Sequence, residues 1–540
     1  MSIDPDTQPT PENPSQTATR YFRTPARRRR WPWIVGYTLW GILGVALAIG
    51  WGVDRAAQHL IDQISPNTAS VAGARQVLAA TTGPDTTFVI LGSDHRSWIP
   101  GGGGLSDSIV LVHLNPPKNL ISIMSVPRDL AVTLPGYAVP QKVNAAYSYG
   151  GPKLSIQTLQ NTLGIKINHY AVVSFAGFFK IVQHLGGLYT QVDRQYYNPL
   201  GTSYSPIDIQ PGYQRLNGND ALAFARFRHT DTDIVRAARQ QQIILDLKRQ
   251  ASTQLGFTDI PLILDTVGGS IETDVNSLST LTNIGQFLLS LPHGRIFHST
   301  LQVGFATIGG GSYDVATPTQ IANSVQEFLH PAGAATQGIT QKPTAPSTSG
   351  PASTTPAIPT TVIPPKSAHV VIRPNALPAG LIVDPAPAQA LRGLGQVGIP
   401  LLVPTLTQSN SRLDVTEVPV RAYKIEGGPN GGWPSVVAVF ANSMAAGSYY
   451  DVQETTMPAP PVMQNPTRVI RTAGRVYDLF QDGKVLRYVG FNQNGVWYWV
   501  SNSLDGVLTP AQMVAIAASL QPASAPVRAP RGVGLLTKGL

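Results

Sequence analysis

The sequence predicts an α+β protein: an α-β-α layered domain with a mixed central sheet, preceded by one transmembrane helix and followed by a smaller antiparallel-sheet-plus-helix domain. Three observations predict this organisation. An uncharged apolar stretch lies near the N-terminus, strand patterns precede helical patterns in the first half, and a Pro/Thr/Ser-rich segment comes before further strand patterns. With 540 residues, the chain is too long for one ordinary core.

Residues 31–53 predict the membrane helix. They carry no charged side chain, and at about 1.5 Å per residue they can cross a hydrocarbon core about 30 Å thick. The run Arg27–Arg30 precedes them, so the positive-inside rule puts the N-terminus in the cytoplasm. A signal peptide cut at Ala46-Leu47-Ala48 is the alternative. Either way we expect the bulk of the chain to be extracytoplasmic, and the span predicts a single-pass protein of the cell membrane.

Charge and cysteine content narrow the function. The net charge is +9, and much of it lies in the tail before the apolar stretch. That cluster indicates either a topology signal or contact with nucleic-acid phosphates, and its position favours the topology signal. We therefore expect no nucleic-acid partner. The chain has no cysteine, which excludes disulfides, thiolate nucleophiles and Cys-ligated metals.

Composition and periodicity divide the chain into segments. We expect a disordered basic tail (1–30), the membrane helix (31–53), a juxtamembrane stalk (54–82), the layered catalytic domain (83–333), a linker (334–369), an accessory α+β domain (370–522) and a tail (523–540). In the layered domain, the runs FVILGSD, SIVLVHL and LISIMSV predict three central strands. Helical patterns lie at Leu154–Leu163, at Phe175–Leu185, from near Asn217, and from Asp233 to about Gln250.

Turn and cap signals define the accessory domain. Asp482-Gly483 and Asn494-Gly495 predict hairpins between β-rich runs, and Thr509-Pro510 with Gln512 predicts the capped start of a final helix. Two aromatic pairs, Trp497 with Trp499 and Tyr449 with Tyr450, favour either stacking on sugar rings or packing in a core. We expect a binding or spacing module.

Two carboxylates stand where predicted strands end or begin. Asp94 follows the strand FVILGS, and Asp107 opens the strand SIVLV. Paired carboxylates at one sheet edge suit Mg²⁺, which takes one or two such ligands and leaves its other positions to water and phosphate oxygens. Two solvated loop aspartates are the alternative.

Arginines form the second candidate group. Arg128 and Asp129 follow a buried strand in SVPRDL, and a forked guanidinium at that place suits phosphate oxygens, with an internal ion pair as the alternative. Further along, ALAFARFRHTDTDIVRAARQQQ holds candidates at helical or strand spacing, namely Arg226, Arg228, Asp233, Arg236 and Gln240. A solvated, salt-bridged helix surface would explain the same run.

Together these segments resemble the LytR-CpsA-Psr family. VILGSDHR, LSDSIVLVHLNP, ISIMSVPRDL, KVNAAYSYGG, FAGFFKIVQHLGGL and LNGNDALAFARFRHTDTDIVRAARQQ occur in the family's order, over about residues 85–330. The resemblance implies a hydrophobic groove for a polyprenyl tail, a Mg²⁺-bound pyrophosphate (Mn²⁺ being the alternative ion), and arginines on the phosphates. It assigns Asp94 and Asp107 to the metal, and Arg128, Arg228 and Arg236, with Arg226 ranked lower, to the pyrophosphate. Asp233 and Gln240 would orient the arginines or activate the acceptor.

The implied activity is a phosphotransferase. A glycopolymer would move from a polyprenyl-pyrophosphate carrier to a hydroxyl of peptidoglycan or another envelope glycan, and polyprenyl phosphate would leave. Such chemistry needs mainly positioning and charge neutralisation, and Asp233 or Asp129 would accept the hydroxyl proton. A lipid-pyrophosphate hydrolase using the same residues, and a non-catalytic envelope-binding or regulatory protein, are the alternatives.

Overall fold

The computed structural model describes residues 55, 58–93, 106–199, 206–227, 233–254, 265–331 and 377–524, apart from short gaps at 67, 267, 395–396, 415–417, 444–447 and 473. Residues from 57 onward form one compact unit. The predicted membrane helix, basic tail and linker lie outside the described residues. Among the helices that are described, none is long and apolar enough to span a bilayer.

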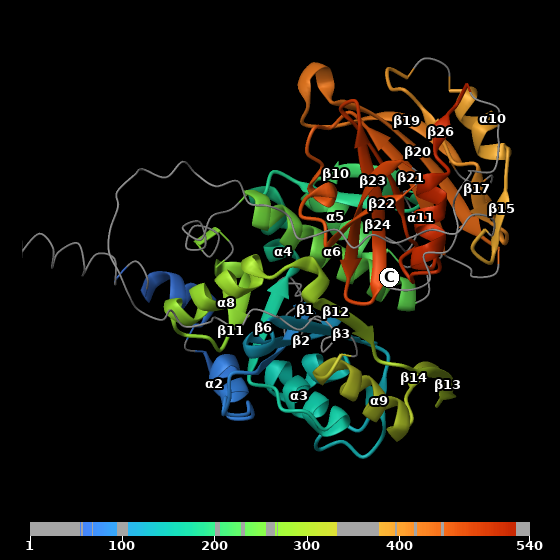
Figure 1. The fold of residues 1–540 in the computed structure, drawn as a ribbon. Coiled ribbons are helices and arrows are strands. Elements are labelled where there is room, and N and C mark those ends of the chain that lie inside the picture. The colour runs from blue at the N-terminus through green and yellow to red at the C-terminus, as the bar shows by residue number, and fades with distance from the viewer. Residues whose placement is uncertain are drawn as a thin grey trace, which may run out of the picture. The chain divides into compact units, whose positions relative to one another are not determined.

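A six-stranded mixed sheet forms the centre of the first half of the chain (Figure 1). Its order is β11 (Ile271–Thr273), β6 (His169–Ser174), β1 (Thr86–Ser93), β2 (Ser106–Asn115), β3 (Leu120–Val126) and β12 (Ile296–Thr300). β1 pairs with β6, and β3 with β12, in parallel, while β2 runs antiparallel to both of its neighbours. β1, β2 and β3 correspond to the three predicted strands, and the sheet is mixed as expected.

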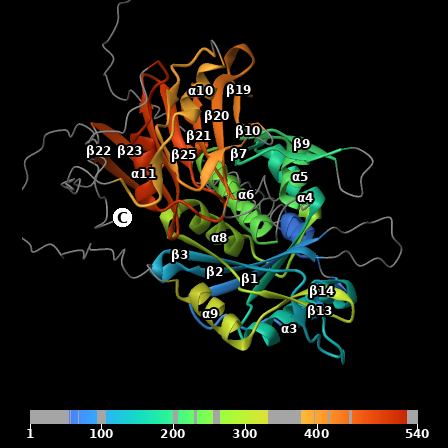
Figure 2. The same cartoon turned by 90° about the vertical axis from the view of Figure 1, so that its right-hand side faces the viewer.

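Helices cover both faces of this sheet, as Figure 2 shows for β1 to β3. On one face, α2 (Ala69–Arg75), α3 (Ala145–Leu163) and α9 (Pro318–Leu329) bury a core that includes Leu91, Met124 and Phe328. On the other face, α6 (Asp233–Gln254) and α8 (Leu278–Ser290) cover Ile123 and Ile296. The alternation of side chains along each strand explains why both faces are apolar.

Some helix bounds differ from the prediction. α3 begins at Ala145, nine residues before the expected start, because two helical segments join at a kink where Gly150 and Gly151 leave helical geometry and Pro152 starts the second segment. α6 extends to Gln254 instead of about Gln250. α2 packs against α3 and adds Ala74 to the core.

A smaller lobe packs beside α6. It holds α4 (Phe175–His184), α5 (Gly218–Arg226), and the hairpins β7 (Leu188–Val192) with β10 (Gly212–Leu216) and β8 (Tyr196–Asn198) with β9 (Ile207–Ile209). The Asn217 side chain caps α5, accepting from the backbone N–H groups of Asn219 and Asp220. Two short hairpins stand at the edge of the main sheet: β4 (Ala131–Val132) with β5 (Gln141–Lys142), and β13 (Gly304–Ile308) with β14 (Gly311–Val315).

The C-terminal half is built on an eight-stranded antiparallel sheet. Its strands are β18 (Ser411–Leu413), β19 (Val420–Ile425), β20 (Trp433–Asn442), β21 (Tyr449–Thr455), β22 (Arg468–Thr472), β23 (Arg475–Asp482), β24 (Val485–Gln493) and β25 (Val496–Ser501). Two further strand pairs belong to this half: β15 (Leu381–Val383) with β17 (Leu406–Gln408), and β16 (Leu402–Val403) with β26 (Gln521–Pro522). Its helices are α10 (Ala386–Arg392) and α11 (Pro510–Ala518).

Local signals account for several connections in this half. Asn494 and Gly495 both have positive φ, as a two-residue hairpin between β24 and β25 requires. Thr509 and Gln512 form the capping box of α11. Trp499 is fully buried and Tyr450 nearly so. For these two rings, core packing was the correct alternative.

Candidate functional site

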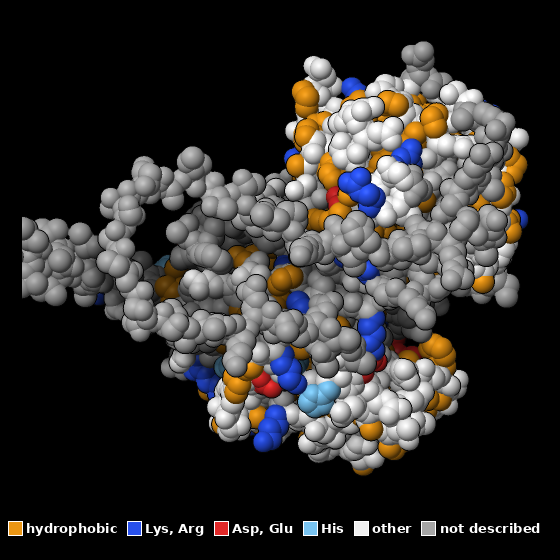
Figure 3. Space-filling model, in the orientation of Figure 1, with side chains coloured by type: hydrophobic (Ala, Val, Ile, Leu, Met, Phe, Trp, Pro, Cys, Tyr) orange, Lys and Arg blue, Asp and Glu red, His pale blue; other side chains and the backbone are white. Residues whose placement is uncertain are grey.

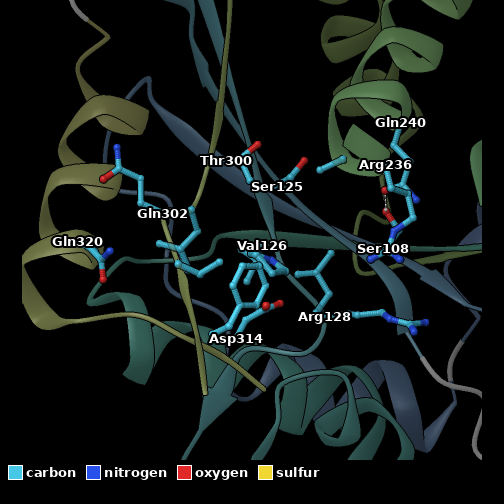
Figure 4. Close-up of a pocket in the computed structure, with 16 residues that line it drawn as sticks. Ser108, Ser125, Val126, Arg128, Arg236, Gln240, Thr300, Gln302, Asp314 and Gln320 are labelled. Carbon is cyan, nitrogen blue, oxygen red and sulfur yellow. Dashed lines mark hydrogen bonds between the residues drawn. The ribbon is translucent and has the colours of Figure 1, made fainter. Parts of the chain in front are cut away.

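A pocket of about 420 Å³ lies where β3 and β12 end and α6 begins (Figure 4). Its lining comes from segments far apart in the sequence: Ser108, Ile109, Ser125, Val126, Pro127, Arg128, Arg236, Ala237, Gln240, Thr300, Leu301, Gln302, Val303, Phe305, Asp314 and Gln320. Three predicted residues, Arg128, Arg236 and Gln240, therefore meet around one cavity.

Arg128 enters the pocket directly after the buried strand β3. Its side chain is 17% exposed, and its Nε lies 3.8 Å from Oδ2 of Asp129. Asp129 in turn accepts an ion pair from Nζ of Lys142 at 3.0 Å, and that ammonium also lies over the Tyr313 ring. The carboxylate of Asp129 is thus shared between two cations, whereas Arg128 is the one of the three that lines the pocket.

Arg236 and Gln240 stand one turn apart on α6, so they share a helix face. Arg236 is 7% exposed. Oε1 of Gln240 accepts from the Ser108 hydroxyl at 3.1 Å, and its Nε2 donates to the Ala225 carbonyl at 3.2 Å. Gln240 is therefore fixed between β2 and α5. A nearly buried guanidinium therefore lies beside a fixed amide in the pocket lining, and the forked donors of a guanidinium match the oxygens of a phosphate.

Two further arginines of the predicted run lie elsewhere. Arg226 ends α5, and its guanidinium stacks 4.3 Å from the centre of the Phe175 ring. Arg239 is fully buried, donates to the Phe224 carbonyl at 2.9 Å and lies over the Tyr196 ring. Neither lines the pocket. Arg239 instead holds the end of α5 against α6.

The metal prediction stays a prediction, because its proposed ligands are not described. In the β1–β2 ladder, Gly92 pairs with Ser108 and Ser93 with Ser106, so Asp107 is the extra residue of a β-bulge. Bulges commonly re-aim a side chain beside an active site. Asp94 and Arg228 lie outside the described residues, as do the side chains of Asp107 and Asp233. Within the described part of the chain, no three His, Asp or Glu side chains gather as metal ligands.

The far end of the pocket was not predicted from the sequence. Figure 4 shows Gln302 and Gln320 at the end of the pocket away from the two arginines, with Thr300 and Asp314 between. Phe305, which is 73% exposed, also lines the pocket. The pocket therefore has a cationic end and an uncharged end with two amide groups. Nothing local in the sequence marks these residues, because they meet only after β12, β14 and α9 pack.

An apolar groove of about 430 Å³ lies between the sheet and the helices α4, α6 and α8. Its walls are almost entirely aliphatic and aromatic: Phe88, Ile90, Val112, Leu114, Ile121, Ile123, Ala171, Ile181, His184, Leu185, Ile244, Leu245, Leu247, Lys248, Ala251, Ile284, Gly285, Leu288, Leu289 and Ile296. The ammonium of Lys248 donates to the Leu291 carbonyl, and burial lowers the pKa of Lys248 to about 8.

On the face drawn in Figure 3, the visible Lys and Arg side chains of the described residues are scattered among polar and apolar ones. The two arginines of the pocket, by contrast, line one cavity.

The first half of the chain matches a known family. The model of the LytR_cpsA_psr family matches residues 57–329. The regulatory protein MsrR of Staphylococcus aureus is 34% identical over 192 residues, which cover 35% of this chain and 56% of MsrR. TagU of Halalkalibacterium halodurans, named as a polyisoprenyl-teichoic acid–peptidoglycan teichoic acid transferase, is 33% identical over 192 residues, covering 35% of this chain and 60% of TagU. The chain thus spans a little over half of each relative's length.

Among solved structures, TagV of B. subtilis matches with a TM-score of 0.41 and 27% identity, covering 46% of this chain and 98% of TagV.

Proposed function

The chain belongs to the LytR-CpsA-Psr family, and on that premise we propose that it transfers a glycopolymer from a polyprenyl-pyrophosphate carrier to a hydroxyl of a cell-wall glycan. The reaction forms a phosphodiester and releases polyprenyl phosphate. The proposal includes a membrane anchor at residues 31–53 and an extracytoplasmic site.

The observation that supports this proposal most is the placement of α6. Its first turns line the polar pocket through Arg236, Ala237 and Gln240, and its next turns line the apolar groove through Ile244 and Leu247. The step from Gln240 to Ile244 is one helical turn, about 6 Å. An amphipathic donor fits this sequence of surfaces, with its isoprenoid tail in the groove and its pyrophosphate at the arginines.

In this mechanism the arginines neutralise the phosphate oxygens. Arg128 and Arg236 offer forked donors to non-bridging oxygens, which stabilises the negative charge of the transition state. Gln240, held by Ser108, keeps the first turns of α6 in place. Arg228 is proposed as a third phosphate ligand, and Arg226 as a weaker one.

The acceptor oxygen attacks the phosphorus on the sugar side, and the bond from that phosphorus to the bridging oxygen breaks. The bridging oxygen leaves with polyprenyl phosphate, and the hydroxyl proton passes to a carboxylate. The sharing of Asp129 between Lys142 and Arg128 disfavours it as the base. We assign that role to Asp233, in the first turn of α6.

Mg²⁺, or Mn²⁺, is proposed as cofactor with Asp94 and Asp107 as its protein ligands. The bulge at Asp107, beside the pocket residue Ser108, fits such a site, since it lies at the end of the β1–β2 ladder where β1 ends with Ser93, the residue before Asp94 in the sequence. Bound there, the ion would offset charge on the pyrophosphate.

The uncharged end of the pocket is proposed to receive a sugar. Amide and hydroxyl groups match the hydroxyls of a pyranose, and the exposed Phe305 offers a ring face for its C–H groups. A second polyanion would suit this end poorly, because the described lining residues there are uncharged and the carboxylate of Asp314 lies between this end and the arginines.

Product analysis tests the function. The purified full chain in detergent is mixed with a polyprenyl-pyrophosphoryl oligosaccharide, a peptidoglycan-type glycan and Mg²⁺, and the products are separated by mass. We expect a phosphodiester-linked conjugate that disappears in Arg128→Ala and Asp107→Ala and persists in Arg412→Ala, an exposed arginine of β18. Polyprenyl phosphate without conjugate would indicate the hydrolase instead. Binding of the donor without turnover would indicate the non-catalytic binding protein.

A further inference from the structure

The C-terminal half contacts α6, the helix that carries the pocket residues Arg236 and Gln240. About 20 Å along α6 from Arg236, at 1.5 Å per residue, the side chain of Arg249 reaches out of the first half of the chain. It pairs with Asp482 at the end of β23, Nη2 to Oδ1 at 3.2 Å, and with Asp246 on its own helix, Nη1 to Oδ1 at 2.6 Å. Asp246, Arg249 and Asp482 are at most 5% exposed.

Asp246, Arg249 and Asp482 form a buried charged triad. Burial alone would lower the pKa of Arg249, but Asp482 and Asp246 raise it overall, so the guanidinium stays charged. Asp482 also lies 3.8 Å from Nε of Arg487. Removing one partner of a buried ion pair strongly destabilises the folded protein, because the remaining charge is left buried without a counter-charge or water. The position of α6 is therefore coupled to the position of β23.

A second, separate link runs through β7. Asp451 of β21 accepts from the Gln191 side chain at 3.1 Å and from the Ser501 hydroxyl at 3.0 Å. The backbone carbonyl of Gln191 then accepts from Nε2 of Gln242 on α6 at 2.7 Å. Gln242 lies two residues beyond Gln240, so this link meets α6 directly after the pocket.

Around these links the contact is tightly packed. Tyr213 of β10 shares a core with Met463, Tyr488 and Trp499 of the C-terminal half, and its hydroxyl accepts from the Val462 backbone. The segment η6 (Pro461–Met463) packs directly on α6. Such a surface does not resemble the loose contact of a tethered module.

We propose that the C-terminal sheet is a positioning element of the transferase, with Asp482 and Gln242 as positioning residues that hold α6 so that Arg236 and Gln240 stand correctly in the pocket. This inference rests on the proposed function. It assigns the C-terminal half a role in ordering the donor site, in place of the binding or spacing role expected from its sequence.

The test compares Asp482→Asn with two control variants, and the free energy of unfolding of each is measured alongside. Asp482→Asn removes the charge at nearly constant shape. Val489→Ala, its matched control, removes methyl groups from the other face of the same sheet, in the core under α11. Lys484→Gln, a second control, removes an exposed ion pair between the β23–β24 turn and Glu327 of α9, which bypasses α6.

Hydrogen exchange is measured by mass spectrometry on the full chain in detergent, over a peptide spanning residues 236–245. The affinity for inorganic pyrophosphate, and kcat and KM for transfer, are then measured for the wild type and each variant. In Asp482→Asn we expect exchange in this peptide to rise about tenfold and pyrophosphate to bind about tenfold more weakly, with kcat falling as well. The two controls should leave the peptide and the affinity unchanged. Should Asp482→Asn fail to fold, Gln242→Met carries the same test.

Equal exchange in Asp482→Asn and Val489→Ala would overturn the proposal, since the sheet would then act on stability alone. The exchange comparison does not need turnover. If the wild type transfers nothing, the proposed function fails while altered exchange still supports coupling; if the wild type transfers and Asp482→Asn behaves like the controls, only the coupling fails.

Discussion

Arg236 lines the pocket and is the more enclosed of its two arginines, so its removal should lower the rate of transfer. We expect Arg236→Ala to lower kcat/KM for transfer about 100-fold, because one preorganised charge donor to the transition state is lost. Arg236→Lys should recover about a tenth of the wild-type rate, since it restores charge without the fork. Steady-state kinetics with a lipid-linked donor measures both. A rate unaffected by either change would remove Arg236 from the site.

Phe305 allows a separate test of the sugar end. Phe305→Ala should raise the KM for the glycan about fivefold, since a ring contact contributes about 1 kcal/mol, and should leave kcat and inorganic pyrophosphate binding unchanged. Phe305→Tyr keeps the ring face and serves as control. An effect on pyrophosphate binding instead would mean that the ring shapes the cationic end.

His298 of β12 makes folding stability depend on pH. Both of its ring nitrogens are buried without a hydrogen-bond partner, although the residue as a whole is partly exposed. Burial lowers its pKa to about 4, against the partial opposition of Asp482. The unfolded chain therefore binds a proton between pH 6.5 and about 4 that the folded chain does not, so this group costs stability as the pH falls through that range, by at most about 3 kcal/mol.

We expect His298→Phe to show a shallower loss of stability than the wild type over that range in urea unfolding followed by tryptophan fluorescence. Buried acids such as Asp246 and Asp451 have raised pKa values and change stability in the opposite sense. They are common to both proteins and cancel in the difference. If stability fell equally with pH in the wild type and His298→Phe, buried His298 would not be a source of the pH dependence.

At the scale of elements, the groove should select donors by their tails. Ala251 of α6 lines it, and Ala251→Phe fills part of its volume. We expect a higher KM for long polyprenyl donors and little change for donors with a short tail, which need less of the groove. Ala322→Phe, on an exposed position of α9 across the sheet, is the matched control. An equal change of KM for long and short donors would contradict binding of the polyprenyl tail in the groove.

The sequence predicted the individual helices and strands better than the contacts between them. The β-rich runs FVILGSD and LISIMSV, the helix start near Asn217 and the turn at Asn494-Gly495 are local signals, and each appears where expected. Arg128 could be selected because it follows a buried strand, and Arg236 and Gln240 because of their helical spacing. Gln302, Asp314 and Gln320 could not, since their neighbourhood depends on how β12, β14 and α9 pack. For the same reason the sequence could not show that Arg226, ranked below Arg236, and Arg239 both stack on aromatic rings.

For the molecule as a whole, the two halves should stay together without a covalent link. We expect a full chain carrying a specific protease site between residues 350 and 351 to yield two fragments that co-elute on size exclusion after cleavage. The buried triad and the Tyr213 core hold them. In the same experiment, the fragments of Asp482→Asn should separate at protein concentrations at which the wild-type fragments still co-elute. Wild-type fragments that elute apart would contradict a tightly packed contact.

The partners of the buried triad are far apart along the chain, and this has a consequence for biosynthesis. Asp482 follows Arg249 by 233 residues. At about 5–20 residues per second, the ribosome adds Asp482 some 10–50 seconds after Arg249. During that interval α6 carries a cation without its second counter-ion, so the first half of the nascent chain stays incomplete and exposed to proteases and chaperones. A stop codon before position 482 would leave a polypeptide that contains every proposed pocket residue and lacks the carboxylate that pairs with Arg249.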